Sequence, residues 1–156
     1  MVLATHALVG AVIGKNIENI WIIALLSIIF HYVLDTIKHG EYVATMNDKN
    51  AFRNTSWKIA LDFGSGLAII LSIIYFKDFD AATIKNIFIG MFFSMLPDGF
   101  TLVYWKTHWK LFEKLYKFHS WCHRLPRFSP ERDWSFKNET YEIVIFLALT
   151  ATLLFL

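Results

Sequence analysis

The sequence predicts an all-α, polytopic membrane protein, and three observations carry that prediction. Apolar residues make up 56% of the 156 residues, while charged residues make up only 18%. The mean hydropathy is +0.44, which indicates more apolar surface than a soluble domain of this length can bury. The apolar residues also gather into long runs, which polar loops and one basic stretch separate. We therefore expect a single membrane-embedded domain over residues 1–156.

The expected helices follow from the lengths of the apolar runs. Leu3 to Gly14 is a short run, since roughly twelve helical residues span about 18 Å and a bilayer core is roughly 30 Å thick. Its glycines and alanines would let neighbouring helices approach closely. Pro97 is expected to end a later helix, and residues 39–56 should form a polar loop. About four spans or near-spans are expected, over residues 17–38, 57–76, 83–97 and 138–156.

The stretch from Phe100 to His123 has a different pattern. Lysines recur there at helical spacing among tryptophan, phenylalanine, leucine and tyrosine, at positions 106, 110, 114 and 117. This pattern predicts an amphipathic basic helix on the membrane surface. Its lysines would bind the anionic headgroups of membrane lipids, and they could also attract an anionic substrate. We expect no nucleic-acid partner.

The charge distribution predicts the orientation of the chain in the membrane. If the helices alternate in direction, twelve lysines and arginines fall on the side with loop 38–58 and segment 98–137, and three fall on the other side. Positive residues gather in cytoplasmic loops, so the first side should face the cytoplasm. The first six residues contain no basic segment, so we expect no cleaved signal peptide. The prediction is a multi-pass protein of the cell (inner) membrane.

Two histidine-containing pairs stand out. His31 and Asp35 are one helical turn apart at the end of an apolar run, where an ionisable group costs roughly 2.5–3.5 kcal/mol. A bound metal would offset that cost, although the pair could instead stabilise helix packing. His119 and His123 have the same spacing, which is a common way to hold zinc.

Candidate ligands from several segments fall at the same predicted membrane face. The set contains His6, His31, Asp35, Asp62, Asp98, His119 and His123. The sequence therefore predicts one shared metal site facing the cytoplasm. Taken singly, His6 could be a packed polar residue and Asp98 a helix-end turn residue. His39 and Glu41 are lesser candidates, and His108 is excluded because it belongs to the basic surface stripe.

The donor types indicate which metals would suit this site. Histidine and aspartate without cysteine favour zinc, with manganese or iron as alternatives, over copper or an iron–sulfur cluster. The set exceeds the four ligands of a tetrahedral ion, so we expect one or two ions. A metal pair can hold a phosphoester and lower the pKa of a bound water. Asp62 or Asp98 would then orient or deprotonate that water as the catalytic carboxylate.

Several short motifs, taken in order, resemble a known family. They are Thr5-His6-x-x-x-Gly10, His31-x-x-x-Asp35-x-x-x-His39, Asp62, Leu96-Pro97-Asp98 and His119-x-x-x-His123. Together they resemble small membrane-bound metal-dependent hydrolases, including the LexA-regulated inner-membrane hydrolase group. His31 and Asp35 are also distantly similar to a motif of the zinc-dependent phospholipase C and S1/P1 nuclease family. The resemblance implies a metal-dependent hydrolase and, by analogy alone, phosphoesterase chemistry.

Three functions are open on this basis. The first is a hydrolase of an ester or phosphoester, possibly attached to a lipid, that uses a metal-activated water. The second is a non-enzymatic membrane protein with a structural or storage metal site. The third is haem binding between opposed histidines, such as His31 with His119 or His123. The acidic residues at the same depth argue against haem, because haem ligation does not use them.

Overall fold

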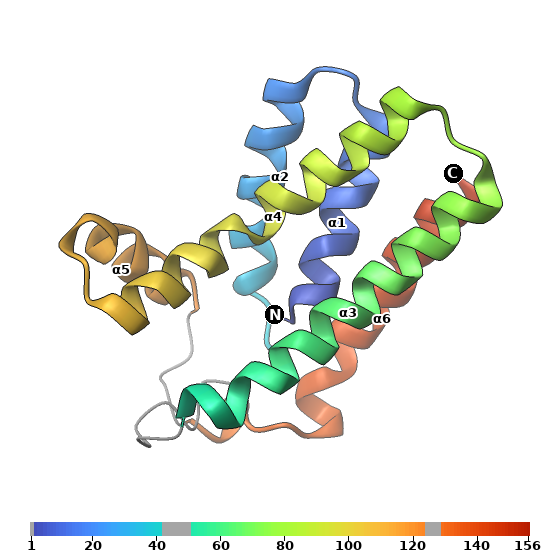
Figure 1. Cartoon of the computed structure of the whole chain (residues 1–156). Coiled ribbons are helices and arrows are strands. Elements are labelled where there is room, and N and C mark those ends of the chain that lie inside the picture. Colours follow the sequence, from blue (N-terminus) through green and yellow to red (C-terminus); the bar gives the residue numbers. More distant parts are fainter. Residues whose placement is uncertain (1, 42–50, 124–128) are drawn as a thin grey trace.

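The computed structural model describes residues 2–41, 51–123 and 129–156, which form helices and contain no strand. This confirms the predicted all-α class. These described ranges contain six α-helices and two short 3-10 helices, and Figure 1 shows their arrangement. In chain order the elements are α1 (Leu3–Asn16), α2 (Ile20–Asp35), α3 (Ala51–Lys77), α4 (Ala81–Thr107), η2 (Lys110–Phe112), α5 (Glu113–Cys122), η3 (Pro130–Arg132) and α6 (Phe136–Phe155).

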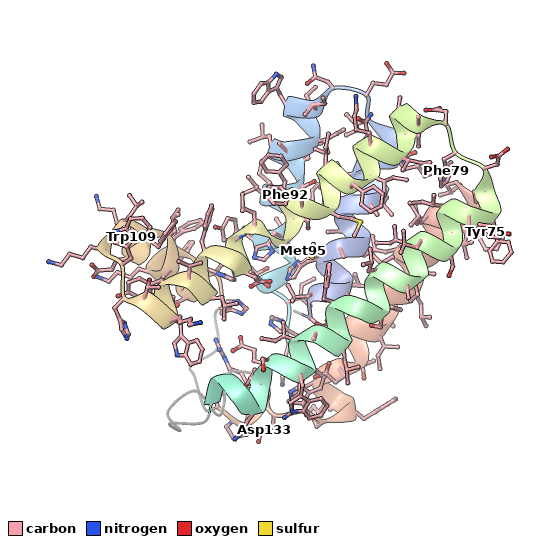
Figure 2. The ribbon with its side chains drawn as sticks, in the orientation of Figure 1. Tyr75, Phe79, Phe92, Met95, Trp109 and Asp133 are labelled. Carbon is pink, nitrogen blue, oxygen red and sulfur yellow. The ribbon has the colours of Figure 1, made fainter. Side chains whose placement is uncertain are left out.

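Within the described residues, three segments are long and apolar enough to cross a membrane, namely Asn54–Lys77, Ala81–Thr107 and Pro130–Phe155. The remaining expected span, residues 17–38, contains α2, whose 16 residues extend about 24 Å. Large apolar side chains cover the outside of the helices, including Tyr75 at 81% and Phe92 at 58% exposure (Figure 2). This outward apolar surface is the one expected for a protein whose helices contact lipid.

Two expected boundaries in the middle of the chain are wrong. The helix does not stop at Pro97, because α4 continues through it to Thr107. Proline removes one backbone hydrogen bond, but a buried proline packed among neighbouring helices is tolerated in membrane proteins. The predicted basic helix over Phe100–His123 is also not continuous. His108 adopts a left-handed conformation with φ 51° and ends α4, and the chain resumes as η2 and α5.

The polar loop after α2 is shorter than predicted. The next helix, α3, begins at Ala51 rather than near Trp57. Residues 42–50 of the expected loop lie outside the described part of the chain, as do residues 124–128 of the connector that follows α5. The described part of that connector contains η3.

Helix α1 is the centre of the fold and packs against α2, α3, α4 and α6. Its predicted close contacts are confirmed at Gly10 and Gly14. A Cβ atom added to Gly10 would collide with the backbone of Gly90, and one added to Gly14 would collide with the backbone of Asn86. The α1 and α4 backbones therefore touch directly, and this contact fixes the register between the helix that carries His6 and the helix that carries Asp98.

Two carboxylates from other helices hold the N-terminus of α1. Asp62 of α3 accepts hydrogen bonds from the amides of Leu3, at 2.7 Å, and Ala4, at 3.3 Å. Glu142 of α6 accepts from the Val2 amide at 2.7 Å. The first amides of a helix lack partners within the helix and carry partial positive charge. The two carboxylates satisfy them and fix the depth of α1 in the bundle.

We predict that Gly10→Ala destabilises the protein by about 1–3 kcal/mol, because overpacking forces the α1 and α4 backbones apart. Thermal unfolding of the detergent-solubilised chain measures this change. The matched control is Gly64→Ala on α3, where an added Cβ meets nothing within 4 Å and should stabilise the helix by about 0.5–1 kcal/mol. Equal unfolding temperatures for the two variants would contradict the direct backbone contact.

Candidate metal centre

The carboxylate of Asp35 lies at the end of α2 among four imidazoles. Its Oδ1 atom is 3.1 Å from His6 Nε2. Its Oδ2 atom is 3.0 Å from His31 Nε2, 2.9 Å from His119 Nε2 and 3.5 Å from His123 Nε2. His6 and His31 are fully buried, and Asp35 is only 2% exposed. One buried carboxylate therefore contacts Nε2 atoms from α1, α2, α5 and the residue that follows α5.

Short local patterns position these groups. His31 and Asp35 occupy the same face of α2 because they are four residues apart. Helix α5 returns along the end of α4, where Tyr104 and Tyr116 stack with ring centroids 4.7 Å apart. This packing brings His119 close to Thr101 and Asp98 of α4.

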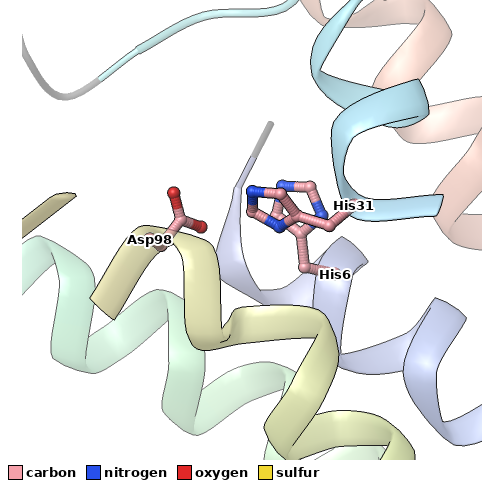
Figure 3. A group of neighbouring side chains, drawn as sticks. All are labelled: His6, His31 and Asp98. Atoms are coloured by element: carbon pink, nitrogen blue, oxygen red, sulfur yellow. The ribbon is translucent and has the colours of Figure 1, made fainter. Parts of the chain in front are cut away.

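The donor atoms form three overlapping groups of possible metal ligands. They are His6, His31 and Asp98; His31, Asp35 and His119; and Asp35, His39 and His123. Within each group the donor atoms all lie within 4.8 Å of one another. Figure 3 shows the first group, in which the two rings lie next to each other and Asp98 approaches from α4.

The distances between imidazole nitrogens match those around a metal ion. His119 Nε2 lies 3.4 Å from His31 Nε2 and 3.1 Å from His123 Nε2. Two nitrogens on one tetrahedral zinc lie roughly 3.3 Å apart, since each Zn–N bond is about 2.0 Å. The same nitrogens therefore lie at the spacing of ligands on one ion.

The opposite ring nitrogens of three histidines have partners of their own. Nδ1 of His39 donates to the Ile37 carbonyl at 2.6 Å, and Nδ1 of His123 lies 2.8 Å from Glu41 Oε1. Nδ1 of His119 lies 2.6 Å from the Thr101 hydroxyl. A carbonyl or carboxylate beside Nδ1 favours a hydrogen at that nitrogen and leaves the Nε2 lone pair for a metal, as in most metal-binding histidines.

Glu41 links three segments beside the centre. Its carboxylate contacts His123 and also pairs with the guanidinium of Arg132, which is 8% exposed. Burial raises the pKa of the Glu41 carboxyl, but the His123 contact and the Arg132 charge outweigh it and lower the pKa to about 2. Burial lowers the pKa of His39 to about 3. At neutral pH Glu41 is charged and His39 is neutral, which is the form that binds metals.

The structure brings six of the seven predicted site residues together. Asp98 lies at the more open edge, with its side chain 31% exposed and its Oδ1 atom 3.6 Å from His119 Nε2. Asp62 is in none of the three groups, and its carboxylate caps α1 instead. His39, a lesser candidate, does join a group. The repeated four-residue spacing of His31, Asp35 and His39 is the sequence signal that could have identified it.

Comparison of the chain with family models, curated proteins and solved structures finds no match.

We predict that Asp62→Ala destabilises the protein by about 1 kcal/mol, because the first amides of α1 lose a capping carboxylate. The same variant should keep its metal affinity, because Asp62 belongs to none of the three groups of possible ligands. Thermal unfolding and equilibrium dialysis with Zn²⁺ measure the two properties separately. A variant with normal stability and no metal affinity would show that Asp62 is a ligand.

We predict that Glu41→Gln weakens metal binding about 10- to 100-fold, as removal of a group that orients a ligand usually does. It should also destabilise the fold, because it removes the negative charge that pairs with the buried Arg132 guanidinium. The double variant Glu41→Gln/Arg132→Gln removes both charges and should recover stability without recovering affinity. Chelator competition and thermal unfolding separate the effects. Affinity that recovers together with stability would give Glu41 a purely structural role.

Proposed function

We propose that the protein is a membrane-bound, metal-dependent hydrolase of an ester or phosphoester. The observation that carries this proposal is the buried Asp35 carboxylate in contact with four imidazole nitrogens. Burying so many ionisable groups is costly unless charge and hydrogen bonding compensate it. A divalent cation compensates it directly, and the donor set favours zinc, with manganese or iron as alternatives.

The ligands would come from four helices and the segment next to α2. His6, His31 and Asp98 form one group and Asp35, His39 and His123 form another, and these two groups share no residue. His119 lies between them, 2.9 Å from Asp35 and 3.6 Å from Asp98. This arrangement has donors for one or two ions. A bound ion would supply Lewis acidity and lower the pKa of a coordinated water.

The aspartates have different roles in this proposal. Asp98 is the most exposed carboxylate of the cluster, so it is the one that an entering water or ester can reach. It would orient or deprotonate the attacking water. Asp35 is buried against the imidazoles and would hold the metal. Asp62 would act at a distance, because it fixes the end of α1 one turn before His6.

The proposed location follows from the helices and the charges. The three long apolar helices would span the cell (inner) membrane, and α2 would serve as a fourth near-span beside α1. The 98–137 segment carries most of the lysines and arginines, which supports a cytoplasmic location for that end of the bundle. The candidate ligands Asp35, His119 and His123 lie where α2 and α5 end, and in this proposal the metal centre faces the same side.

The second candidate is a structural or storage metal site without catalysis. The complete burial of His6 and His31 favours it, because a deeply buried ion with a filled ligand shell has no position for a substrate. The partial exposure of Asp98 favours the hydrolase. Hydrolysis of model esters by the metal-loaded protein distinguishes the two.

We predict that the detergent-purified chain holds about one or two divalent ions and hydrolyses an activated phosphodiester when it is loaded with zinc or manganese. His31→Ala and Asp35→Ala should lose both properties. His108→Asn is the matched control, since this histidine is exposed and lies outside the ligand groups. Metal analysis and product release measure the outcome. A metal-free protein with the same stability in all variants would overturn the proposal.

A further inference from the structure

Helix α5 has two chemically different faces. His119 and Cys122 point into the protein and are 3% and 5% exposed. The opposite face carries Lys114, Lys117 and Trp121, which are exposed, and Phe118 at its edge, which is exposed but also contacts the ring of Tyr32 in α2. These four positions follow the spacing of one helical stripe. The side of α5 that faces away from the metal centre is therefore both basic and aromatic.

The composition of this outward face matches that of a helix in a lipid headgroup layer. Trp121 is 75% exposed and Phe118 is 47% exposed, which is costly in water. Residues 105–121 contain four lysines and a single glutamate, Glu113. Glu113 pairs with Lys117 at 2.6 Å, so the stretch keeps a net positive charge. Aromatic rings at the acyl boundary and lysines at the phosphates are typical of interfacial helices.

The fold also places α5 at the depth expected of the lipid headgroups. The candidate span in α4 ends at Thr107, and the left-handed residue His108 turns the chain there. Helix α5 then packs beside the last turns of α4 (Figure 1). Trp109 and Leu111, at this turn, are 59% and 65% exposed. An element that starts where a spanning helix leaves the hydrocarbon core lies at the level of the headgroups.

We propose that the outward face of α5 binds anionic lipid headgroups and that the substrate of the metal centre is an amphiphile of the same leaflet. The second half rests on the proposed hydrolase function. The opposite face of α5 carries His119, and a helix with its side chains is only about 10–12 Å across. The metal centre is thus within one helix diameter of the headgroups, so an ester in a lipid headgroup can reach it without leaving the membrane.

The binding of anionic lipid by α5, the lipid half of the proposal, is tested with the full chain in vesicles of phosphatidylcholine containing phosphatidylglycerol. Electron spin resonance of spin-labelled lipids gives the preference of the protein for the anionic lipid. We expect a preference of about five-fold or more for the native chain, lost at high salt and largely lost in Lys114→Gln/Lys117→Gln. The matched control Lys77→Gln/Lys85→Gln removes the same charge at the other end of α3 and α4 and should keep the preference.

The substrate half is tested with the metal-loaded protein in the same vesicles. A lipid-anchored phosphodiester and its water-soluble counterpart are compared. The Lys114→Gln/Lys117→Gln variant should lose several-fold in rate on the anchored ester only. Equal rates on both esters in both proteins would overturn the substrate half. No hydrolysis of either ester would overturn the hydrolase function and leave the lipid preference standing.

Absence of an anionic-lipid preference in the native chain would overturn the whole inference. So would a double lysine variant as selective as the native chain. If the native chain shows no preference and cross-links to a second copy through α5, the outward face is a protein interface instead.

Discussion

The buried carboxylate of Asp35 is the constraint on which the rest of the structure depends. At 2% exposure an ionised carboxylate is stable only with strong partners. Those partners are imidazoles of α1, α2 and α5 and the residue after α5. The three helices must therefore end, turn and pack so that their Nε2 atoms reach one point. The caps of α1 and the reversal at His108 meet that requirement.

Much of the fold and of the cluster could be predicted from local sequence. Apolar runs identified the helices, and four-residue spacing identified the pairs His31/Asp35 and His119/His123, because both patterns depend only on helix geometry. The small residues of α1 likewise indicated its close contacts. The prediction that His6 and Asp98 lie at the same membrane face came from the distribution of lysines and arginines over the whole chain.

The remaining features depend on partners distant in sequence. Proline usually ends a helix, and only the packing around Pro97 shows why α4 continues. Asp62 is a carboxylate within an apolar run, so the sequence predicted it as a metal ligand. Its partners are instead backbone amides about sixty positions earlier in the chain. Glu41 contacts His123 while it pairs with Arg132, which is 91 positions away in the chain. No local pattern distinguishes a carboxylate that binds a metal from one that caps a helix or orients a histidine.

The direct contact between α1 and α4 makes the relative position of His6 and Asp98 independent of the outer surface of the protein. Gly10 and Gly90 meet backbone to backbone, so the angle and spacing of these two helices do not depend on any side chain that faces the exterior. The exposed apolar positions of α3, α4 and α6 can therefore differ widely in size without moving His6 relative to Asp98. In a bilayer of another thickness we expect α3 and α6 to tilt first, while the distance between His6 and Asp98 stays the same.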